Sequence, residues 1–359
     1  MGVYTTINDS SVYFQTKIYT GTGNTSTSYT NDGNANLQPD LLWNKNRSTS
    51  TNHILVDSIL GVTKNLRPDV TDGLGTNSNF TKSFDTDGFA MGDSARVGTN
   101  GDLYCAWQWK INGGTTSSVG VGSITTTVQV NTTAGISIAR YQGNGVNGAT
   151  IGHGLGKIPK VVIVKGEEGS ESWQIFHGAR NNPEQKFLEL DANSTGGTNA
   201  NRWSNTAPTN SIINLGNGNS VNYSGRMFRA YSFAEIQGYS HFGKYNGNGS
   251  NSVGPFIYTG FKPAWVMIKR VDSNGNWYIY DTERNGSSGS NTNQAHRILY
   301  ANDTSGEVNN SDRGIDMVSN GFKVRNTLGD VNDSSGSYIT FAFATHPFVS
   351  SAGVPTVAR

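Results

Sequence analysis

The chain has 359 residues, enough for two or three domains, and it is nearly neutral, with 27 lysines and arginines against 26 aspartates and glutamates. This balance gives no basic surface for nucleic acid, and no run of about 18 apolar residues is present to insert into a membrane. Cys105 is the single cysteine, which excludes an intrachain disulfide and a cysteine-based zinc site. Charged residues make up only 15% of the chain, while glycine supplies 45 residues, so the polar surface must come mainly from Asn, Ser and Thr.

Short segments rich in β-branched and aromatic residues predict strands along the whole chain, because each is bounded by Gly, Asn, Asp or Pro. Examples in chain order are residues 40–44, 160–165, 265–269 and 338–343. The best helical candidate is the stretch 183–190, which we keep as an alternative to a strand. The sequence therefore predicts an all-β protein.

Internal similarity is the strongest pattern in the chain. The phrase Tyr-x-Gly-x-Gly begins at Tyr19, Tyr141 and Tyr245. A proline that opens an apolar strand follows each phrase, at Pro39, Pro159 and Pro263. A lysine stands six residues after each proline, at Lys45, Lys165 and Lys269. A second strand begins fourteen residues after each proline, at His53, Trp173 and Trp277. Each copy closes with a strand of alternating large apolar residues, at 104–109, 228–233 and 338–343.

The repeated offsets predict three tandem homologous repeats, each a small antiparallel β-sandwich of jelly-roll or lectin-like type. Each copy is too long for a propeller blade of four strands. The predicted boundaries are an N-terminal segment 1–16, repeat 1 at 17–110, a linker with one strand at 111–135, repeat 2 at 136–240, repeat 3 at 241–347 and a C-terminal tail 348–359.

A glycine pattern in the second copy invites a different interpretation. Gly143, Gly145 and Gly148 form G-x-G-x-x-G after a strand-like run, as in a dinucleotide-binding loop. Such a loop must lead into a helix that holds the pyrophosphate, and Pro159 with its glycine-rich approach prevents one. A Walker-like stretch at 152–157 lacks the required spacing. We therefore interpret these glycines as part of a repeated turn and expect no cofactor.

Other chemistry-bearing residues are scattered. The six histidines are His53, His153, His177, His241, His296 and His346. His53 and His177 occupy repeat positions that another copy fills with Trp277 and Asp281, which favours packing or surface roles. We name no catalytic, cofactor-binding or metal-ligating residue and expect no enzyme.

Two acidic turns leave calcium binding open. They are Asp85-Thr-Asp87-Gly88 and Asp272-Ser-Asn274-Gly275. Clustered oxygens beside a glycine could hold calcium, but neither turn has the distal glutamate of an EF-hand loop, and Asp-Gly and Asn-Gly are ordinary hairpin residues. Most aromatic residues fall on the predicted strands, so we expect them in the core rather than on sugar-binding surfaces.

The chain resembles a family of virion proteins from marine bacteriophages that infect cyanobacteria and SAR11-type bacteria. The resemblance runs from end to end and rests on phrases such as LQPDLLWNKNR, ATIGHGLGKIPKVVIVK, FAEIQGYSHFGKYNGNG, GPFIYTGFKPAWVMIKR and VPTVAR. It implies a virion structural or tail-fibre-like protein and brings no catalytic residues. The copies differ at aligned positions, since His53 and Leu60 stand where another copy has Trp173 and Arg180, which speaks against one binding function shared by all three.

Two functions follow as expectations. The first is a non-enzymatic structural protein on the outer surface of the phage particle: a tail fibre, tail appendage or capsid-decorating component. It would contact other virion proteins and form a homo-oligomer. The alternative is a receptor-recognition module that binds host-surface carbohydrate, with or without calcium, during host attachment.

Overall fold

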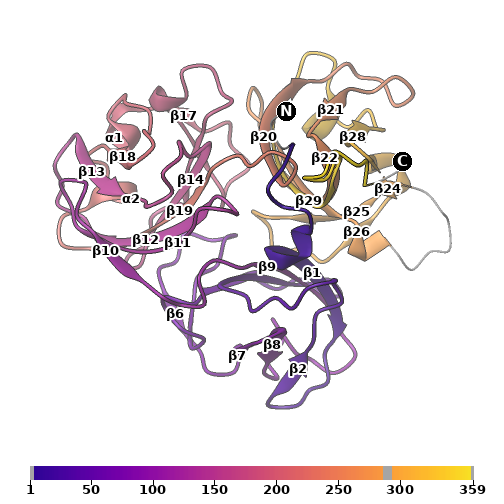
Figure 1. Cartoon of the computed structure of the whole chain (residues 1–359), viewed down its shortest axis with the longest axis horizontal. Coiled ribbons are helices and arrows are strands. Elements are labelled where there is room, and N and C mark those ends of the chain that lie inside the picture. Colours follow the sequence, from indigo (N-terminus) through magenta and orange to yellow (C-terminus); the bar gives the residue numbers. More distant parts are fainter. Residues whose placement is uncertain (1–3, 286–292, 357–359) are drawn as a thin grey trace.

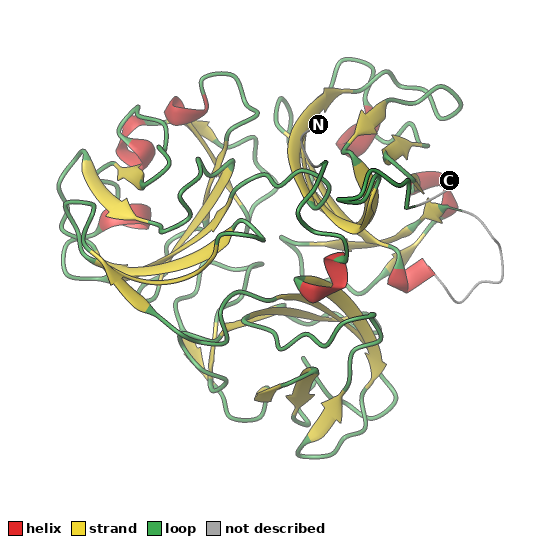
Figure 2. Cartoon of the chain, in the orientation of Figure 1, coloured by secondary structure: helices red, strands yellow, loops and turns green. Residues whose placement is uncertain are grey.

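The computed structural model describes residues 4–285 and 293–356, and it consists of antiparallel β-sheets joined by turns (Figure 2). The predicted all-β class is confirmed. The described residues contain three α-helices of four residues each: α1 (Ala200–Trp203), α2 (Asn219–Asn222) and α3 (Gly329–Asn332). Within residues 4–285 and 293–356, no helix has the length and apolar character needed to cross a membrane.

The helical candidate at 183–190 is mainly a strand. A 3-10 turn, η2 (Pro183–Gln185), leads directly into β16 (Lys186–Glu189). Proline suits the first turn of a helix, but the strand begins after three residues. The other 3-10 turns are η1 (Ser10–Val12), η3 (Glu283–Asn285) and η4 (Ser311–Arg313).

The chain forms three lobes around a common centre, and we call them units 1, 2 and 3 in chain order (Figure 1). Unit 1 has the main sheet β1-β9-β3-β4 and a smaller sheet β2-β8-β7. The main-sheet strands are β1 (Phe14–Thr20), β9 (Leu103–Trp109), β3 (Leu41–Asn46) and β4 (Ile54–Asp57). The others are β2 (Thr27–Tyr29), β8 (Gly88–Met91), β7 (Thr81–Asp85) and the pair β5 (Lys64–Asn65) and β6 (Gly75–Thr76).

Unit 2 has the main sheet β10-β11-β12-β19-β14-β15-β16-β17 and the smaller sheet β13-β18. Its remaining main-sheet strands are β10 (Ser117–Val119), β11 (Thr126–Asn131), β12 (Ile136–Gln142), β19 (Met227–Phe233), β14 (Val161–Gly166), β15 (Gln174–His177) and β17 (Gly197–Thr198). The smaller sheet contains β13 (Ala149–Gly152) and β18 (Ile212–Leu215).

Unit 3 has the main sheet β20-β29-β22-β23-β25-β26 and the smaller sheet β21-β28-β27-β24. The main-sheet strands are β20 (Ser240–Asn246), β29 (Ser337–Pro347), β22 (Phe261–Arg270), β23 (Trp277–Asp281), β25 (Arg297–Tyr300) and β26 (Val308–Asn309). The smaller sheet contains β21 (Phe256–Tyr258), β28 (Gly321–Val324), β27 (Ile315–Val318) and β24 (Gln294–Ala295). In each unit, the strand that contains the tyrosine of the Tyr-x-Gly-x-Gly phrase (β1, β12 or β20) therefore pairs with the last strand, which pairs in turn with the strand at the repeated proline.

The expected linker at 111–135 contains two strands instead of one. β11 pairs with β12 from Asn131↔Ile136 to Thr127↔Arg140, and β10 adds to its outer edge. The segment forms strands because Thr126 and Val128 are buried at alternate positions, and Val128 joins the apolar core of unit 2. The segment is thus part of a sheet.

Each main sheet is apolar on both faces. In β9, Tyr104 and Ala106 pack against the smaller sheet of unit 1, whereas Trp107 and Trp109 point into a core shared with units 2 and 3. β19 and β29 divide in the same way, with Tyr231, Phe233, Phe341 and Phe343 in the shared core. The units are therefore not independent sandwiches, because one face of every main sheet is covered only by the other two units.

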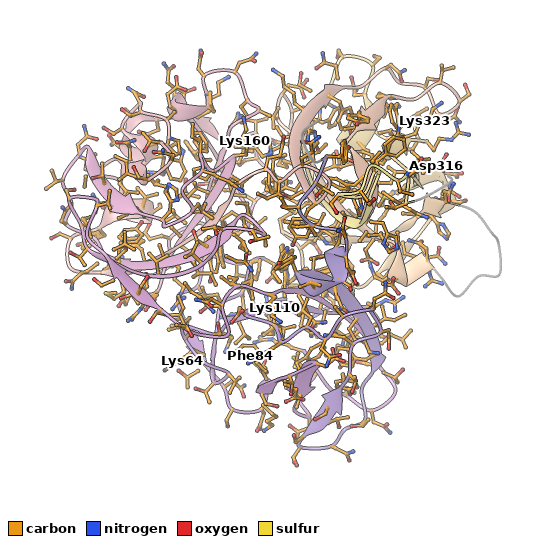
Figure 3. All side chains as sticks on the ribbon, in the orientation of Figure 1. Lys64, Phe84, Lys110, Lys160, Asp316 and Lys323 are labelled. Carbon is orange, nitrogen blue, oxygen red and sulfur yellow. The ribbon has the colours of Figure 1, made fainter. Side chains whose placement is uncertain are left out.

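The shared core fills the centre of the molecule (Figure 3). It leaves a small apolar cavity of about 40 Å³, lined by residues from all three units, including Trp43, Tyr231 and Trp265. The expectation that the aromatics lie in the core is confirmed for the seven tryptophans, each of which is at most 5% exposed. Burial on this scale makes the centre the main source of hydrophobic stabilisation.

Candidate functional site

The glycines of the second Tyr-x-Gly-x-Gly phrase form a tight turn between two strands. The Gly143 amide donates to the Arg226 carbonyl oxygen, and Gly145 has φ +70°. A Cβ at Gly143 would lie 2.4 Å from the Tyr223 carbonyl oxygen, so only glycine fits there. After Gly148 the chain enters strand β13. The interpretation of these glycines as a turn that leads into a strand is confirmed.

The same turn occurs three times with the same contacts. A Cβ at Gly21 or Gly247 would also meet a backbone carbonyl oxygen, at 2.2 and 2.1 Å. Gly23 and Gly249 have φ +71° and +67°. The tyrosine that begins each phrase donates its hydroxyl to a valine carbonyl oxygen: Tyr19 to Val97, Tyr141 to Val221 and Tyr245 to Val331. The phrase therefore encodes one recurring anchor, which ties the tyrosine's strand to the segment that precedes the last strand of the unit.

The three lysines of the repeated offset are fully buried, and each one joins two units. Lys45 Nζ donates to the carbonyl oxygen of Thr304 in unit 3 at 3.0 Å. The equivalent bonds run from Lys165 to Thr71 in unit 1 at 2.6 Å and from Lys269 to Asn193 in unit 2 at 3.1 Å. Each ammonium also bonds carbonyl oxygens near its own strand. We call the three contact regions junctions 1/2, 2/3 and 3/1 after the units that they connect.

The first residue of the second strand phrase also crosses a junction. Trp173 Nε1 donates to the Arg67 carbonyl oxygen at 3.0 Å, and Trp277 Nε1 donates to that of Glu189 at 2.9 Å. His53 replaces the indole in unit 1. Its Nε2 lies 3.0 Å from the Tyr300 carbonyl oxygen, and its Nδ1 accepts a bond from Trp43. The histidine thus preserves the cross-junction bond, and burial lowers its pKa well below the usual value.

The last residue of the same strand faces the neighbouring unit with different chemistry at each junction. Asp57 receives two bonds of 2.8 Å from the Arg229 guanidinium and one of 2.9 Å from the Tyr231 hydroxyl, all three groups being fully buried or nearly so. Asp281 accepts from Trp107 Nε1 at 3.0 Å. His177, at junction 2/3, places Nε2 3.3 Å from the Thr340 carbonyl oxygen across the junction, and its Nδ1 accepts from the Ala179 amide of its own unit.

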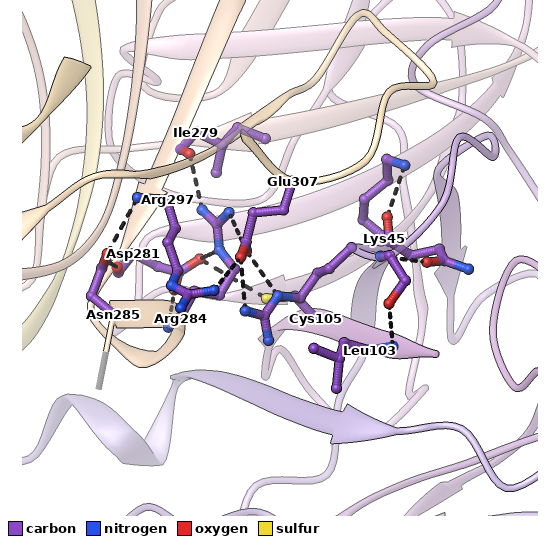
Figure 4. A network of polar contacts seen from close by, with 12 residues as sticks. Lys45, Leu103, Cys105, Ile279, Asp281, Arg284, Asn285, Arg297 and Glu307 are labelled. Atoms are coloured by element: carbon purple, nitrogen blue, oxygen red, sulfur yellow. Dashed lines mark hydrogen bonds and ion pairs between the residues drawn. The ribbon is translucent and has the colours of Figure 1, made fainter. Parts of the chain in front are cut away.

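Junction 3/1 also contains a buried charged network (Figure 4). Glu307 pairs with Arg47 at 2.8 Å, Arg297 at 2.9 Å and Arg284 at 3.2 Å. Although burial raises the pKa of Glu307, the bond from Arg47 and the charges of Arg284 and Arg47 hold it below its usual value. The carboxylate therefore stays ionised as the centre of a link between units 1 and 3.

Cys105 and Asp281 lie side by side in this network, with Sγ 3.9 Å from Oδ2 (Figure 4). A thiol beside a carboxylate and Arg284 has the composition of a catalytic site. However, burial and the Asp281 charge raise the pKa of the Cys105 thiol well above its usual value, and the side chain is fully buried. A protonated, enclosed thiol is not a nucleophile, so the network acts as a structural link.

The two acidic turns that were considered for calcium lie in separate units. Asp85 accepts from the Ser83 hydroxyl, and Asp87 accepts from the Leu37 amide. Asp272 pairs with Arg270 at 2.9 Å. Gly275, in the turn that contains Asn274, bonds the Asn193 carbonyl oxygen, so that turn helps to build junction 2/3. Among residues 4–285 and 293–356, no group of three or more His, Cys, Asp or Glu side chains converges to hold a metal ion.

The other histidines lie apart from one another. His153 is buried, with Nε2 3.2 Å from the Thr209 carbonyl oxygen, and burial lowers its pKa. His241 pairs with Glu235 at 3.1 Å on the surface of unit 3. His296 donates its backbone amide to the Asn285 side-chain oxygen, and His346 lines a separate surface hollow.

A polar surface cleft of about 520 Å³ opens between units 2 and 3. Arg180 and Lys186 line it from unit 2, and Lys244 lines it from β20 of unit 3. Asp272 also lines it but is paired with Arg270. We call this hollow the cationic cleft. The sequence reasoning missed it, because its three cations come from segments far apart in the chain.

The described residues define an all-β protein in which three β units are joined by buried hydrogen bonds and ion pairs. Residues 9–347 match the family described as Domain of unknown function (DUF7483), and the chain belongs to that family. No curated protein and no solved structure matches the chain.

Proposed function

We propose that this chain is a non-enzymatic structural protein on the outer surface of a bacteriophage particle, as a tail fibre, tail appendage or capsid-decorating component. Its three units are, in this proposal, tandem homologous β-sandwich repeats of jelly-roll or lectin-like type. The resemblance to marine phage virion proteins supports the role. The matching strand order of the main sheets and the matching Tyr-x-Gly-x-Gly anchors support the repeats.

The observation that carries the proposal is the use made of the buried polar groups. Lys45, Lys165 and Lys269 each bond the neighbouring unit, and Cys105 and Asp281 are enclosed in a network without access to substrate. Side chains of the types that serve catalysis in open sites connect the sheets of neighbouring units in this protein. Such interlocking suits a particle component that must stay folded outside the cell without disulfides.

Assembly with other copies and with other virion proteins is part of the same proposal. The main sheets end in short edge strands such as β17 (Gly197–Thr198) and β26 (Val308–Asn309), which limit uncontrolled strand pairing. Light scattering on the purified chain would test the homo-oligomer directly.

Host attachment through carbohydrate is the second candidate function, alone or with calcium at the Asp85 or Asp272 turn. Phe256, Tyr258 and Tyr223 are exposed by 49%, 55% and 39%, and exposed aromatic rings can stack on sugars. This function is compatible with the first, since a surface fibre can carry the receptor site.

The test is a proteomic and labelling experiment on purified particles of a phage that encodes the chain. We expect its peptides in stoichiometric amounts, and gold-labelled antibody against it on intact particles. Particles purified to homogeneity that lack the chain would contradict the proposal. Labelling only after disruption would contradict the outer location.

A further inference from the structure

The cationic cleft is lined by three cations and one carboxylate, and that carboxylate is already paired with Arg270. The Arg180 guanidinium donates Nη1 to the Phe187 carbonyl oxygen at 2.9 Å and Nη2 to that of Thr195 at 3.5 Å, and no ion pair to it is formed within residues 4–285 and 293–356. Burial lowers the pKa of Arg180 to about 10, and no neighbouring carboxylate offsets that burial. A half-buried guanidinium without a counterion is costly unless an anion is bound.

The surroundings of Arg180 increase the imbalance. Lys186, at the start of β16, and Lys244, in β20, line the same hollow, and neither forms an ion pair in the described part of the chain. Lys244 Nζ bonds the Asn181 side-chain oxygen at 3.0 Å, which holds the lysine at the rim. Burial lowers the pKa of Lys269 to about 8, and the nearby charge of Arg180 contributes to this lowering.

Two fully buried arginines have a carboxylate partner within the fold. Arg229 is paired with Asp57 and Arg284 with Asp281, both at hydrogen-bonding distance and both inside a junction. Arg180 is placed differently, because it borders an open hollow and its only potential partner there, Asp272, is bound to Arg270. The missing anion is therefore expected to come from solution.

We propose that the cationic cleft binds an oxyanion, a carboxylate or sulfate group, carried by an acidic saccharide. The guanidinium of Arg180 would bond the oxyanion, Lys186 and Lys244 would add charge, and the amides of Asn181 and Asn246 would bond sugar hydroxyls. The volume of about 520 Å³ is that of a site for one or two sugar rings. The inference of an oxyanion depends on the residues of the cleft alone, whereas the inference of a saccharide also depends on the proposed role at the particle surface.

The experiment is isothermal titration of the full chain with three probes: sodium sulfate, an unsaturated chondroitin sulfate disaccharide and neutral maltotriose. We expect the sulfated disaccharide to bind more tightly than sulfate and maltotriose not to bind. Arg180→Gln should weaken binding of the disaccharide about tenfold or more. Lys244→Gln should weaken it about threefold, since a rim charge contributes less. Arg180→Lys, which keeps the charge, guards against a folding effect and should retain part of the affinity.

Lys160→Gln is the matched control, because Lys160 is an exposed lysine of unit 2 outside the cleft (Figure 3). Its affinity should equal that of the wild type. Equal affinity of the wild type and a folded Arg180→Gln variant, or no binding of either anionic probe, would overturn the cleft as an oxyanion site. Sulfate that binds as tightly as the disaccharide would overturn the saccharide part alone, and neither result bears on whether the chain is found on particles.

Discussion

Junctions 1/2 and 2/3 join equivalent strands with opposite chemistry. At junction 1/2, Asp57 faces Arg229 and Tyr231, so a buried carboxylate is neutralised by a guanidinium whose Nη1 bonds both of its oxygens. At junction 2/3, His177 faces Thr340 and packs edge-on against Phe341, with ring centroids 4.9 Å apart. The facing strand differs accordingly: β19 presents a charged arginine to Asp57, whereas β29 presents a backbone carbonyl oxygen and an aromatic ring to His177. The geometry of the junction is thus fixed by the shared lysine and indole bonds, while the end-of-strand pair is free to be ionic or neutral.

The largest difference between the two junctions should appear when each end-of-strand residue is truncated. Asp57→Ala leaves the buried Arg229 with only its more distant carboxylate, Glu167 at 3.3 Å, and should lower the free energy of unfolding by about 3–5 kcal/mol. His177→Ala removes two long neutral hydrogen bonds, of 3.3 Å each, and some packing, and should cost about 1–2 kcal/mol. Urea unfolding of both variants measures this. Replacing the pair by Asp57→Leu with Arg229→Met should recover most of the loss, and equal costs at the two junctions would contradict the comparison.

A second comparison lies within the glycine phrase of unit 2. Gly143→Ala places a Cβ 2.4 Å from the Tyr223 carbonyl oxygen and should cost about 2–3 kcal/mol. Gly148→Ala meets only the Ser204 hydroxyl at 3.7 Å and should cost about 1 kcal/mol, from its positive φ. Thermal unfolding separates the two. If Gly148→Ala were the more damaging change, the third glycine would have a role that the turn does not explain.

The lysines test what the junctions have in common. Lys45→Met, Lys165→Met and Lys269→Met each leave carbonyl oxygens on two units without a donor and should cost about 2 kcal/mol at pH 7. The three values should agree within about 1 kcal/mol, because the bonds are alike. A junction whose lysine can be removed without loss would not be built like the others. Lys160→Met on the surface is the control.

The smallest effect is the acid dependence of junction 2/3. Burial lowers the pKa of His177 to about 3, whereas a histidine in the unfolded chain titrates near 6.5. Between these values only the unfolded chain binds the proton, so the free energy of unfolding falls with decreasing pH by about 1.4 kcal/mol per unit. His177→Gln should remove that slope and leave those of His53 and His153. Parallel curves for variant and wild type between pH 6.5 and 5 would contradict a buried neutral histidine.

The sequence contained the periodic and local features of this fold. The apolar strand phrases, the tight glycines and the offsets to Lys45, Lys165 and Lys269 all follow from spacing, and the structure places each of them in an equivalent position. A charged residue inside an apolar strand, such as Arg229 in β19, also predicts a buried ion pair.

The remaining features depend on contacts between distant parts of the chain. Lys45 and Thr304 are 259 residues apart, and Asp57 and Arg229 are 172 residues apart, so no local pattern indicates either pair. The shared core was missed for a related reason. Alternation along β9 predicts one buried face. Both faces of this strand are apolar, however, and only the assembly of the units decides what covers the second face.

Three units that are joined by these junctions should unfold as one cooperative body, and amide hydrogen exchange in the wild type and in Asp57→Ala measures whether they do. We expect amides of β29, which does not contact Asp57, to lose protection by the same free energy as amides of β9 and β19. Loss of protection confined to β9 and β19, with β29 unchanged, would show that the units open separately and would contradict the claim.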